Sequence, residues 1–94
     1  MHPTEVSQHA RARMQQRGIT PDLLQLLTTY GARAHDHHGS ELRYFDKAAR
    51  RRLRSATGEA VWRRLESRLD VYAVIARDGC IVTVGHRDKR ITRH

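Results

Sequence analysis

A histidine among several cations lies near the C-terminal end of the chain, in the segment 83–90, TVGHRDKR. Neighbouring positive charge favours the neutral imidazole of His86, which can accept a proton. Arg87, Lys89 and Arg90 are suited to hold a phosphate and to stabilise the extra negative charge of its transition state. The alternative interpretation is a solvated basic tail in which the histidine is incidental.

Two arginines lie on the face of the first predicted helix that should pack against the rest of the protein. At about 100° per residue, Arg13 and Arg17 share one broad face with apolar residues, and His9 lies at its edge. A charge on a packed face must be paired or must line a cleft. The two arginines therefore either form internal salt bridges, for instance Arg17 with Asp22 or Asp46, or make one wall of a phosphate site.

A dense run of arginines lies in the segment 47–69, which has a helical pattern. Its arginines are Arg50, Arg51, Arg52, Arg54, Arg63, Arg64 and Arg68. Such a run is usually a solvated helix face. Its density also suits contacts along a nucleic-acid backbone, with Arg50, Arg51 and Arg54 as candidate contacts, and such binding is steeply salt-dependent. The side chains that could stack on bases are Tyr44, Phe45, Trp62 and Tyr72.

The candidate metal ligands are the histidines of the segment 35–38, HDHH. His35 and His37 share one face of a predicted strand, and imidazole is a common zinc ligand. No second cluster completes the site, and the segment precedes a Gly-Ser turn. We therefore favour an exposed polar hairpin end, and we expect no cofactor. Cys80 is the only cysteine, so no internal disulfide can form.

The chain is short and strongly basic. It has 94 residues, with 18 Lys or Arg against 10 Asp or Glu and a formal net charge of +8. This length predicts a single domain over 1–94, and the charge predicts a polyanionic partner such as nucleic acid or an anionic membrane. No segment approaches the roughly 18 apolar residues of a membrane span, and no N-terminal signal peptide is recognisable. We therefore expect a cytoplasmic protein that does not bind membranes.

Helix and strand signals follow one another along the chain and define the elements that must position these residues. Ser7 caps a helix over 8–17, and Thr20 begins a second helix that stops at Gly31. Two strands are expected within 32–46, a helix over 47–69 that Gly58 can divide, and strands over 70–77 and 80–86 around an Asp-Gly turn. The order predicts an α+β fold with two N-terminal helices, a small, mainly antiparallel four-stranded sheet and a helical insertion.

Apolar periodicity predicts which of these faces point inward. On the 47–69 helix the expected stripe consists of Ala49, Leu53, Ala56 and Ala60 and continues with Val61, Leu65 and Leu69. Leu42 and Tyr44, with Phe45 as a further candidate, supply the apolar side of the second strand, and Val71, Ala73 and Ile75 supply one face of the third.

The opening segment 9–19 has the pattern HAxxRMxxRGI. It resembles the opening of a family of short bacterial proteins known only as a domain of unknown function. Members of that family continue with a helix like the segment 21–24, PDLL, then a strand pair like 43–46, RYFD, and end in a strand like 81–86, IVTVGH. The segment 47–69 looks like an insertion relative to the shorter members.

That family is similar to the RelE/ParE-like toxins and to the metal-independent ribonucleases that include barnase and the colicin tRNases. The resemblance implies a RelE-like fold, RNA as the partner, either free or on the ribosome, and an acidic antitoxin protein. It implies cleavage by transesterification, with His9 and His86 as base and acid. It also implies that Arg13, Arg17 and Arg87 stabilise the pentavalent phosphate.

Two other functions are consistent with the same residues. A non-catalytic nucleic-acid-binding module needs only a continuous basic surface, and its affinity should survive His9→Ala and His86→Ala together. A partner-binding regulator would instead dock an acidic protein on its basic face. We rank the ribonuclease first, the binding module close behind it and the regulator third.

Overall fold

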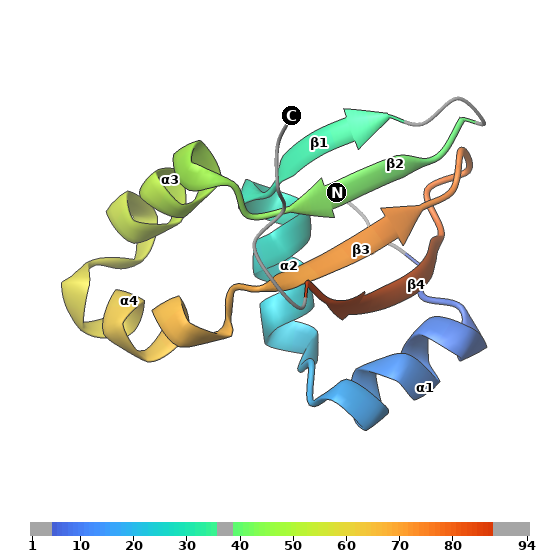
Figure 1. The fold of residues 1–94 in the computed structure, drawn as a ribbon, viewed down its shortest axis with the longest axis horizontal. Coiled ribbons are helices and arrows are strands. Elements are labelled where there is room, and N and C mark those ends of the chain that lie inside the picture. The colour runs from blue at the N-terminus through green and yellow to red at the C-terminus, as the bar shows by residue number, and fades with distance from the viewer. Residues whose placement is uncertain (1–4, 36–38, 88–94) are drawn as a thin grey trace.

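The computed structural model describes residues 5–35 and 39–87 and has an α+β architecture (Figure 1). Its elements are α1 (Gln8–Arg17), α2 (Pro21–Tyr30), β1 (Ala32–His35), β2 (Glu41–Tyr44), α3 (Lys47–Thr57), α4 (Glu59–Leu65), the 3-10 turn η1 (Glu66–Arg68), β3 (Val71–Ile75) and β4 (Ile81–His86). The strands form one sheet in the order β1-β2-β3-β4, and each neighbouring pair is antiparallel. The predicted α+β class and the antiparallel four-stranded sheet are confirmed.

Polar side chains determine where the helices begin. The Ser7 hydroxyl accepts a hydrogen bond from the Ala10 amide at 3.0 Å, and the Thr20 hydroxyl accepts one from Leu23 at 3.1 Å. Asp46 caps α3 in the same way, at 2.8 Å from the Ala49 amide. Each cap satisfies an amide that the first helical turn leaves without a partner, so the chain turns at a defined residue.

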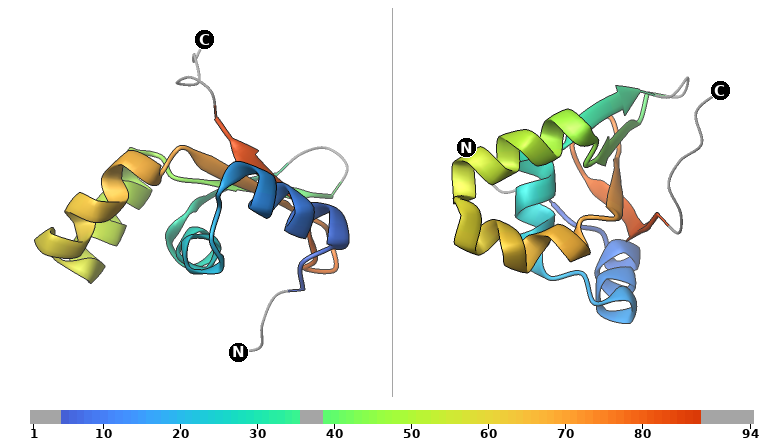
Figure 2. Two further views of the ribbon diagram at one scale, coloured as in Figure 1. Left: turned by 90° about the horizontal axis from the view of Figure 1, so that it is seen from below. Right: turned by 60° about the vertical axis from the view of Figure 1, so that its left-hand side comes forward.

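Both α1 and α2 lie on one side of the sheet, and no described helix covers the other side (Figures 1 and 2). The buried core lies between these helices and the sheet, and it extends to the base of α3 and α4. Its members are Ala10, Ile19, Leu23, Leu24, Leu27, Phe45, Ala49, Leu53, Trp62, Leu69, Val71, Ala73, Ile75, Ile81 and Val84. We call the helix-covered side the covered face and the other side the open face.

The strand alternation is confirmed for β3 but was assigned to the wrong side for β2. Val71, Ala73 and Ile75 are buried on the covered face, as predicted. On β2, the residue opposite Ala73 is Arg43, so Leu42 and Tyr44 point to the open face instead of the core. Hydrophobicity alone favoured the wrong side because the buried arginine finds partners at the end of α2.

The segment 47–68 forms a helical hairpin that projects from one end of the sheet (Figure 1). We call this segment the arm. Gly58 divides it, with φ 86° and ψ 167°, a conformation that is accessible almost only to glycine. The predicted apolar stripe is confirmed in part: Ala49, Leu53 and Leu69 are buried, and Leu65 packs against the core. Ala56, Ala60 and Val61, which lie around the turn at Gly58, are exposed, and Trp62 of α4 packs inward instead.

Candidate nucleic-acid interface

α1 lies beside β4, and two of its arginines bond to the backbone. Arg13 Nε donates to the Val84 carbonyl at 3.3 Å, and Arg11 Nε donates to the Val6 carbonyl at 3.2 Å. No ion pair of the described residues involves Arg13 or Arg17, so the internal salt bridge, one of the two alternatives expected for these arginines, is absent there. Arg13 therefore helps to hold α1 along the edge of the sheet.

His86 and His9 lie at opposite ends of α1. His86 Nε2 is 2.8 Å from the Arg17 carbonyl oxygen at the C-terminal end of the helix. Since a carbonyl oxygen only accepts, Nε2 donates, and Nδ1 is the remaining acceptor of the neutral ring. His9 lies in the first turn, about 12 Å from Arg17 along the helix axis. The structure thus does not bring the two histidines to a single phosphate, although both are exposed.

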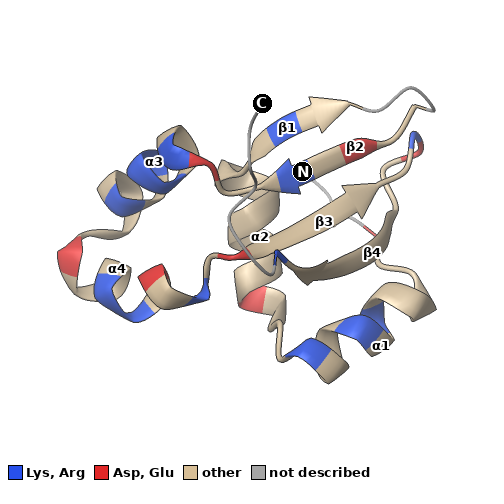
Figure 3. Ribbon diagram, viewed as in Figure 1, with Lys and Arg blue, Asp and Glu red and all other residues tan. Residues whose placement is uncertain are grey.

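The arm carries eight Lys or Arg residues and only two Glu (Figure 3). Some of its cations are paired. Arg54 makes two hydrogen bonds to Glu59, at 2.9 and 2.8 Å, and Arg50 pairs with Asp70 at 3.0 Å. Arg63 lies 3.9 Å from Glu59, and Arg52 donates to the Tyr30 carbonyl at 3.0 Å. The cations of the arm that have no hydrogen-bond or ion-pair partner among the described residues are Lys47, Arg51, Arg64 and Arg68.

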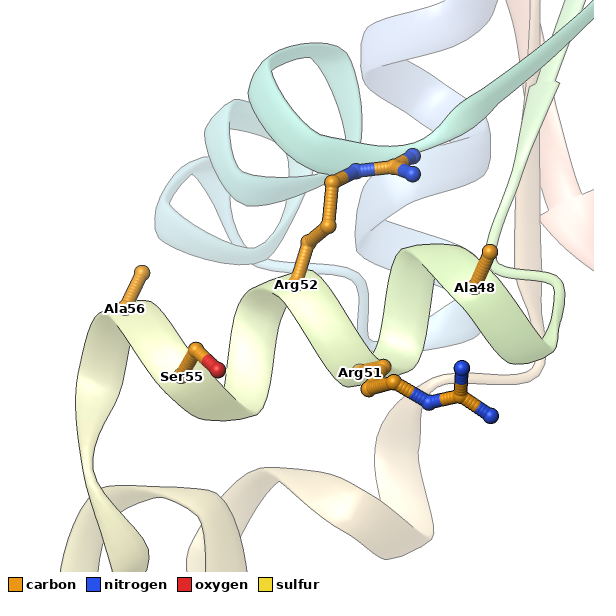
Figure 4. A pocket seen from close by; sticks show the side chains of 5 residues that line it. All are labelled: Ala48, Arg51, Arg52, Ser55 and Ala56. Atoms are coloured by element: carbon orange, nitrogen blue, oxygen red, sulfur yellow. The ribbon is translucent and has the colours of Figure 1, made fainter.

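A hollow of about 550 Å³ lies on the surface of α3 (Figure 4). Its lining consists of Ala48, Arg51, Arg52, Ser55 and Ala56. Figure 4 shows that Arg51 and Arg52 point in different directions, with Arg52 directed toward α2. Because a single helix face lines it, the hollow is an open part of the arm surface. It is therefore not an enclosed catalytic site.

The open face brings together two of the four predicted stacking residues. Tyr44 on β2 lies opposite Tyr72 on β3, and both rings are half-buried. The Arg87 guanidinium lies over the Tyr44 ring, 4.7 Å from its centre. Phe45 and Trp62 are instead buried core residues, 3% and 8% exposed. Stacking by Phe45 or Trp62 is therefore excluded unless the core opens.

Arg43 is a buried cation that the sequence did not single out. It is 7% exposed, and its guanidinium donates to the Thr28 carbonyl at the end of α2 and to Glu41 Oε2. Burial lowers the pKa of Arg43, while the attraction of Glu41 opposes that shift. The exposed Arg33 binds the same Glu41 oxygen at 3.2 Å. Arg43 thus fastens α2 to the sheet and is not available to a ligand.

In comparisons with known proteins, no family model, curated protein or solved structure matches the chain. His35 is exposed on β1, and the described residues contain no group of three or more His, Cys, Asp or Glu that could hold a metal ion. No helix among them is long and apolar enough to cross a membrane. The predicted site residues His37, Lys89 and Arg90 lie outside the described residues.

Proposed function

We propose that the protein binds RNA and that the arm contacts the backbone phosphates. The observation that carries this proposal is the set of unpartnered cations on the arm, Lys47, Arg51, Arg64 and Arg68. An unpaired, solvated cation gains most from a phosphate, because binding releases the counterions that surround the nucleic acid. Arginine also matches the phosphate oxygens with a planar pair of donors.

RNA is favoured over other polyanions by the pattern HAxxRMxxRGI over 9–19, which resembles a family similar to RNA-cleaving toxins. The arm also carries more cations than its ion pairs use, because only Arg50, Arg54 and Arg63 pair with a carboxylate. The proposed ligand is RNA of the cytoplasm, either free or on the ribosome. An acidic protein docked on the same cations is the competing partner, and the experiment below separates the two.

The test is the affinity for RNA as a function of salt concentration. With four free cations engaged, log Kobs should fall with log salt at a slope of about −3, since each neutralised phosphate of a single strand contributes about −0.7. The variant Arg51→Gln/Arg64→Gln/Arg68→Gln should reduce the slope to about −1. The matched control, Arg11→Gln/Arg33→Gln/Arg77→Gln, changes the net charge equally and should keep most of the slope.

Equal slopes for the two triple variants would assign binding to net charge alone and contradict the role of the arm. Absence of RNA binding at about 50 mM salt, where phosphate contacts are strongest, would refute RNA as the ligand. Tight, salt-sensitive binding of an acidic protein in that case would support the partner-binding regulator.

RNA cleavage of the RelE-like kind is a second candidate, favoured by the corner formed by His86 and Arg17. The Arg17 carbonyl orients the imidazole, both residues are exposed, and the Arg17 guanidinium has no partner among the described residues. Nδ1 of His86 would take the proton of a ribose 2′-hydroxyl, whose oxygen attacks the adjacent phosphorus. The 5′-oxygen leaves and takes a proton from water, which yields a 2′,3′-cyclic phosphate and a 5′-hydroxyl. Arg17 would stabilise the charge on phosphorus.

Mapping of RNA 5′ ends after induction in a bacterial host tests this candidate. Wild type and His9→Ala should both produce new 5′-hydroxyl ends, and His86→Ala should produce none although it accumulates as a folded protein. Profiles identical to an uninduced control would leave RNA binding without cleavage as the function. An acidic antitoxin, the partner that accompanies a toxin, would be required only if the new ends appear.

A further inference from the structure

The open face is unlike the rest of this highly charged molecule. Register and alternation place eight residues on it in two rows across the sheet, Ala32, Tyr44, Tyr72 and Gly85 in one and Ala34, Leu42, Val74 and Thr83 in the other. None of the eight is charged, although 30% of the residues of the chain are. Leu42 is 38% exposed, one of the two large hydrophobic side chains that are exposed among the described residues. An uncharged face of this kind marks a contact surface.

The ring of Tyr72 is held against the sheet by the absence of a side chain at Gly85. A Cβ atom at Gly85 would lie 2.8 Å from the Tyr72 hydroxyl oxygen and 2.9 Å from its Cζ, which is closer than atoms pack. The outer half of the ring therefore lies over the backbone of β4, directly across from Tyr72 in the register. A ring in this position covers the backbone of β4, and Tyr72 as a whole stays half-buried, so it keeps part of its surface accessible.

Arg87 extends this flat surface. Its guanidinium lies over the ring of the neighbouring Tyr44, and its amide donates to the Asp70 carbonyl at 2.9 Å, which anchors the chain just beyond β4. A guanidinium stacked on an aromatic ring is itself a planar, positively charged surface for a base. The row of Tyr44 and Tyr72 thus carries both aromatic area and positive charge.

The same row adjoins the arm. Tyr44 is the last residue of β2, and α3 begins at Lys47. Asp70, which bonds to the amide of Arg87, also pairs with Arg50 on α3 at 3.0 Å. Figure 1 shows the arm projecting from this end of the sheet, so a strand that follows the cations of the arm meets the two tyrosines next.

We infer that the open face stacks unpaired bases on Tyr72 and on the Arg87–Tyr44 pair, and that the RNA taken by this protein is single-stranded. The inference rests on the proposed function and names its substrate class. Four-stranded sheets with exposed aromatic residues bind single strands in this way, because splayed bases offer their flat faces to the rings. In a duplex those faces are already stacked on one another, so a duplex can use only the arm.

The experiment measures the affinity for a single-stranded RNA of about ten nucleotides, a length within the usual site sizes, and for the blunt duplex that it forms with its complement. Wild type should bind the single strand about tenfold more tightly than the duplex. Tyr72→Leu, which keeps apolar volume without a ring, should lose that preference and leave duplex binding unchanged. Tyr72→Phe keeps the ring and should behave as wild type.

Gly85→Ala tests the position of the ring. It should weaken single-strand binding several-fold alone and have no further effect when combined with Tyr72→Leu, since it acts through the Tyr72 ring. Thermal unfolding of each variant confirms that the fold is retained, and Tyr72→Phe serves as the conservative reference.

Equal affinity of wild type for both RNAs, or single-strand binding that Tyr72→Leu does not change, would overturn base stacking on the open face. RNA binding by the arm would remain in place. A concentration-dependent dimer that Tyr72→Leu converts to a monomer would overturn base stacking in favour of a second copy on this face. Polyglutamate binding that Tyr72→Leu weakens as much as it weakens single-strand binding would overturn it in favour of an acidic protein. Failure to bind either RNA would overturn both base stacking on the open face and the proposed function.

Discussion

α1 and the arm are both rich in arginine, but they use it for different purposes. On α1, Arg13 donates to the Val84 carbonyl and holds the helix along β4, and Arg11 donates to the Val6 carbonyl just before the helix. On the arm, Arg51, Arg64 and Arg68 face solvent without a partner among the described residues, and the others are held mostly by exposed ion pairs. Composition therefore does not decide which cations are available to a ligand; the carbonyls and carboxylates within reach decide it.

The largest effect is expected where an arginine is bonded and buried. Arg43→Ala should lower the free energy of unfolding by about 3 kcal/mol, because it removes the partner of the Thr28 carbonyl and leaves a cavity. Arg33→Ala, which removes an exposed partner of the same Glu41, should cost less than about 0.5 kcal/mol. Urea denaturation measures both, and similar losses would mean that the burial of Arg43 does not matter.

The next largest effects are expected at the glycines that end α3 in the arm and α1, where substitution by alanine should lower stability by different amounts. Gly58 in the arm has a backbone conformation that is almost restricted to glycine, so Gly58→Ala should cost about 2 kcal/mol. Gly18 at the end of α1 has φ 68° and ψ 30°, where Gly18→Ala should cost about 1 kcal/mol. Thermal unfolding compares the two variants. If Gly58→Ala were the milder change, the arm would not depend on its sharp turn.

Arg13→Met should show the structural role of α1 with a smaller effect. It keeps the apolar stem of the side chain and loses the bond to the Val84 carbonyl, for a cost of about 1 kcal/mol in stability. Affinity for RNA, measured by titration, should change less than about twofold, since one distant charge contributes little through screened solvent. A large loss of RNA binding with unchanged stability would place Arg13 in the interface.

The smallest effect is expected at the exposed pair of the arm. Arg54→Gln removes two hydrogen bonds to Glu59 and the guanidinium that lies 5.7 Å from the ring centre of Trp62. The cost should be below about 0.5 kcal/mol, because exposed ion pairs add little to stability. Trp62 is the only tryptophan, so its fluorescence reports the change at the arm directly. A loss above 1 kcal/mol, an order-of-magnitude bound from exposed pairs, would show that Arg54 organises the arm.

Local signals in the sequence predicted the caps at Ser7 and Thr20 and the alternation of β3, because each depends on residues within one turn or one strand. The side chosen for β2 was wrong, since the partner that accepts a buried Arg43 is a backbone carbonyl of α2 and has no sequence signature. The sequence did not predict the open face for the same reason. Alternation predicts that each strand has two faces, but only the tertiary structure decides which face the helices cover.

The candidate site was predicted in part for a similar reason. Helical periodicity places His9, Arg13 and Arg17 on one side of α1, but it says nothing about which end of the helix meets His86. The segment 47–69 holds eight of the 18 Lys or Arg residues of the chain, so the arginine run located a dense group of cations. The ion pairs of these arginines with Glu59 and Asp70 remove Arg54 and Arg50 from the free cations. They depend on the turn at Gly58 and on the return of the chain from α4 to Asp70, just before β3.

The most direct test of the central claim is to map the amides whose NMR signals move when a single-stranded RNA of about ten nucleotides is added. The account predicts shifts in the arm and in the strand segments that carry Tyr44 and Tyr72, with little change along α1. Shifts confined to α1 and His86, with the arm and the open face unaffected, would contradict it and place the nucleic acid at the opposite side of the molecule.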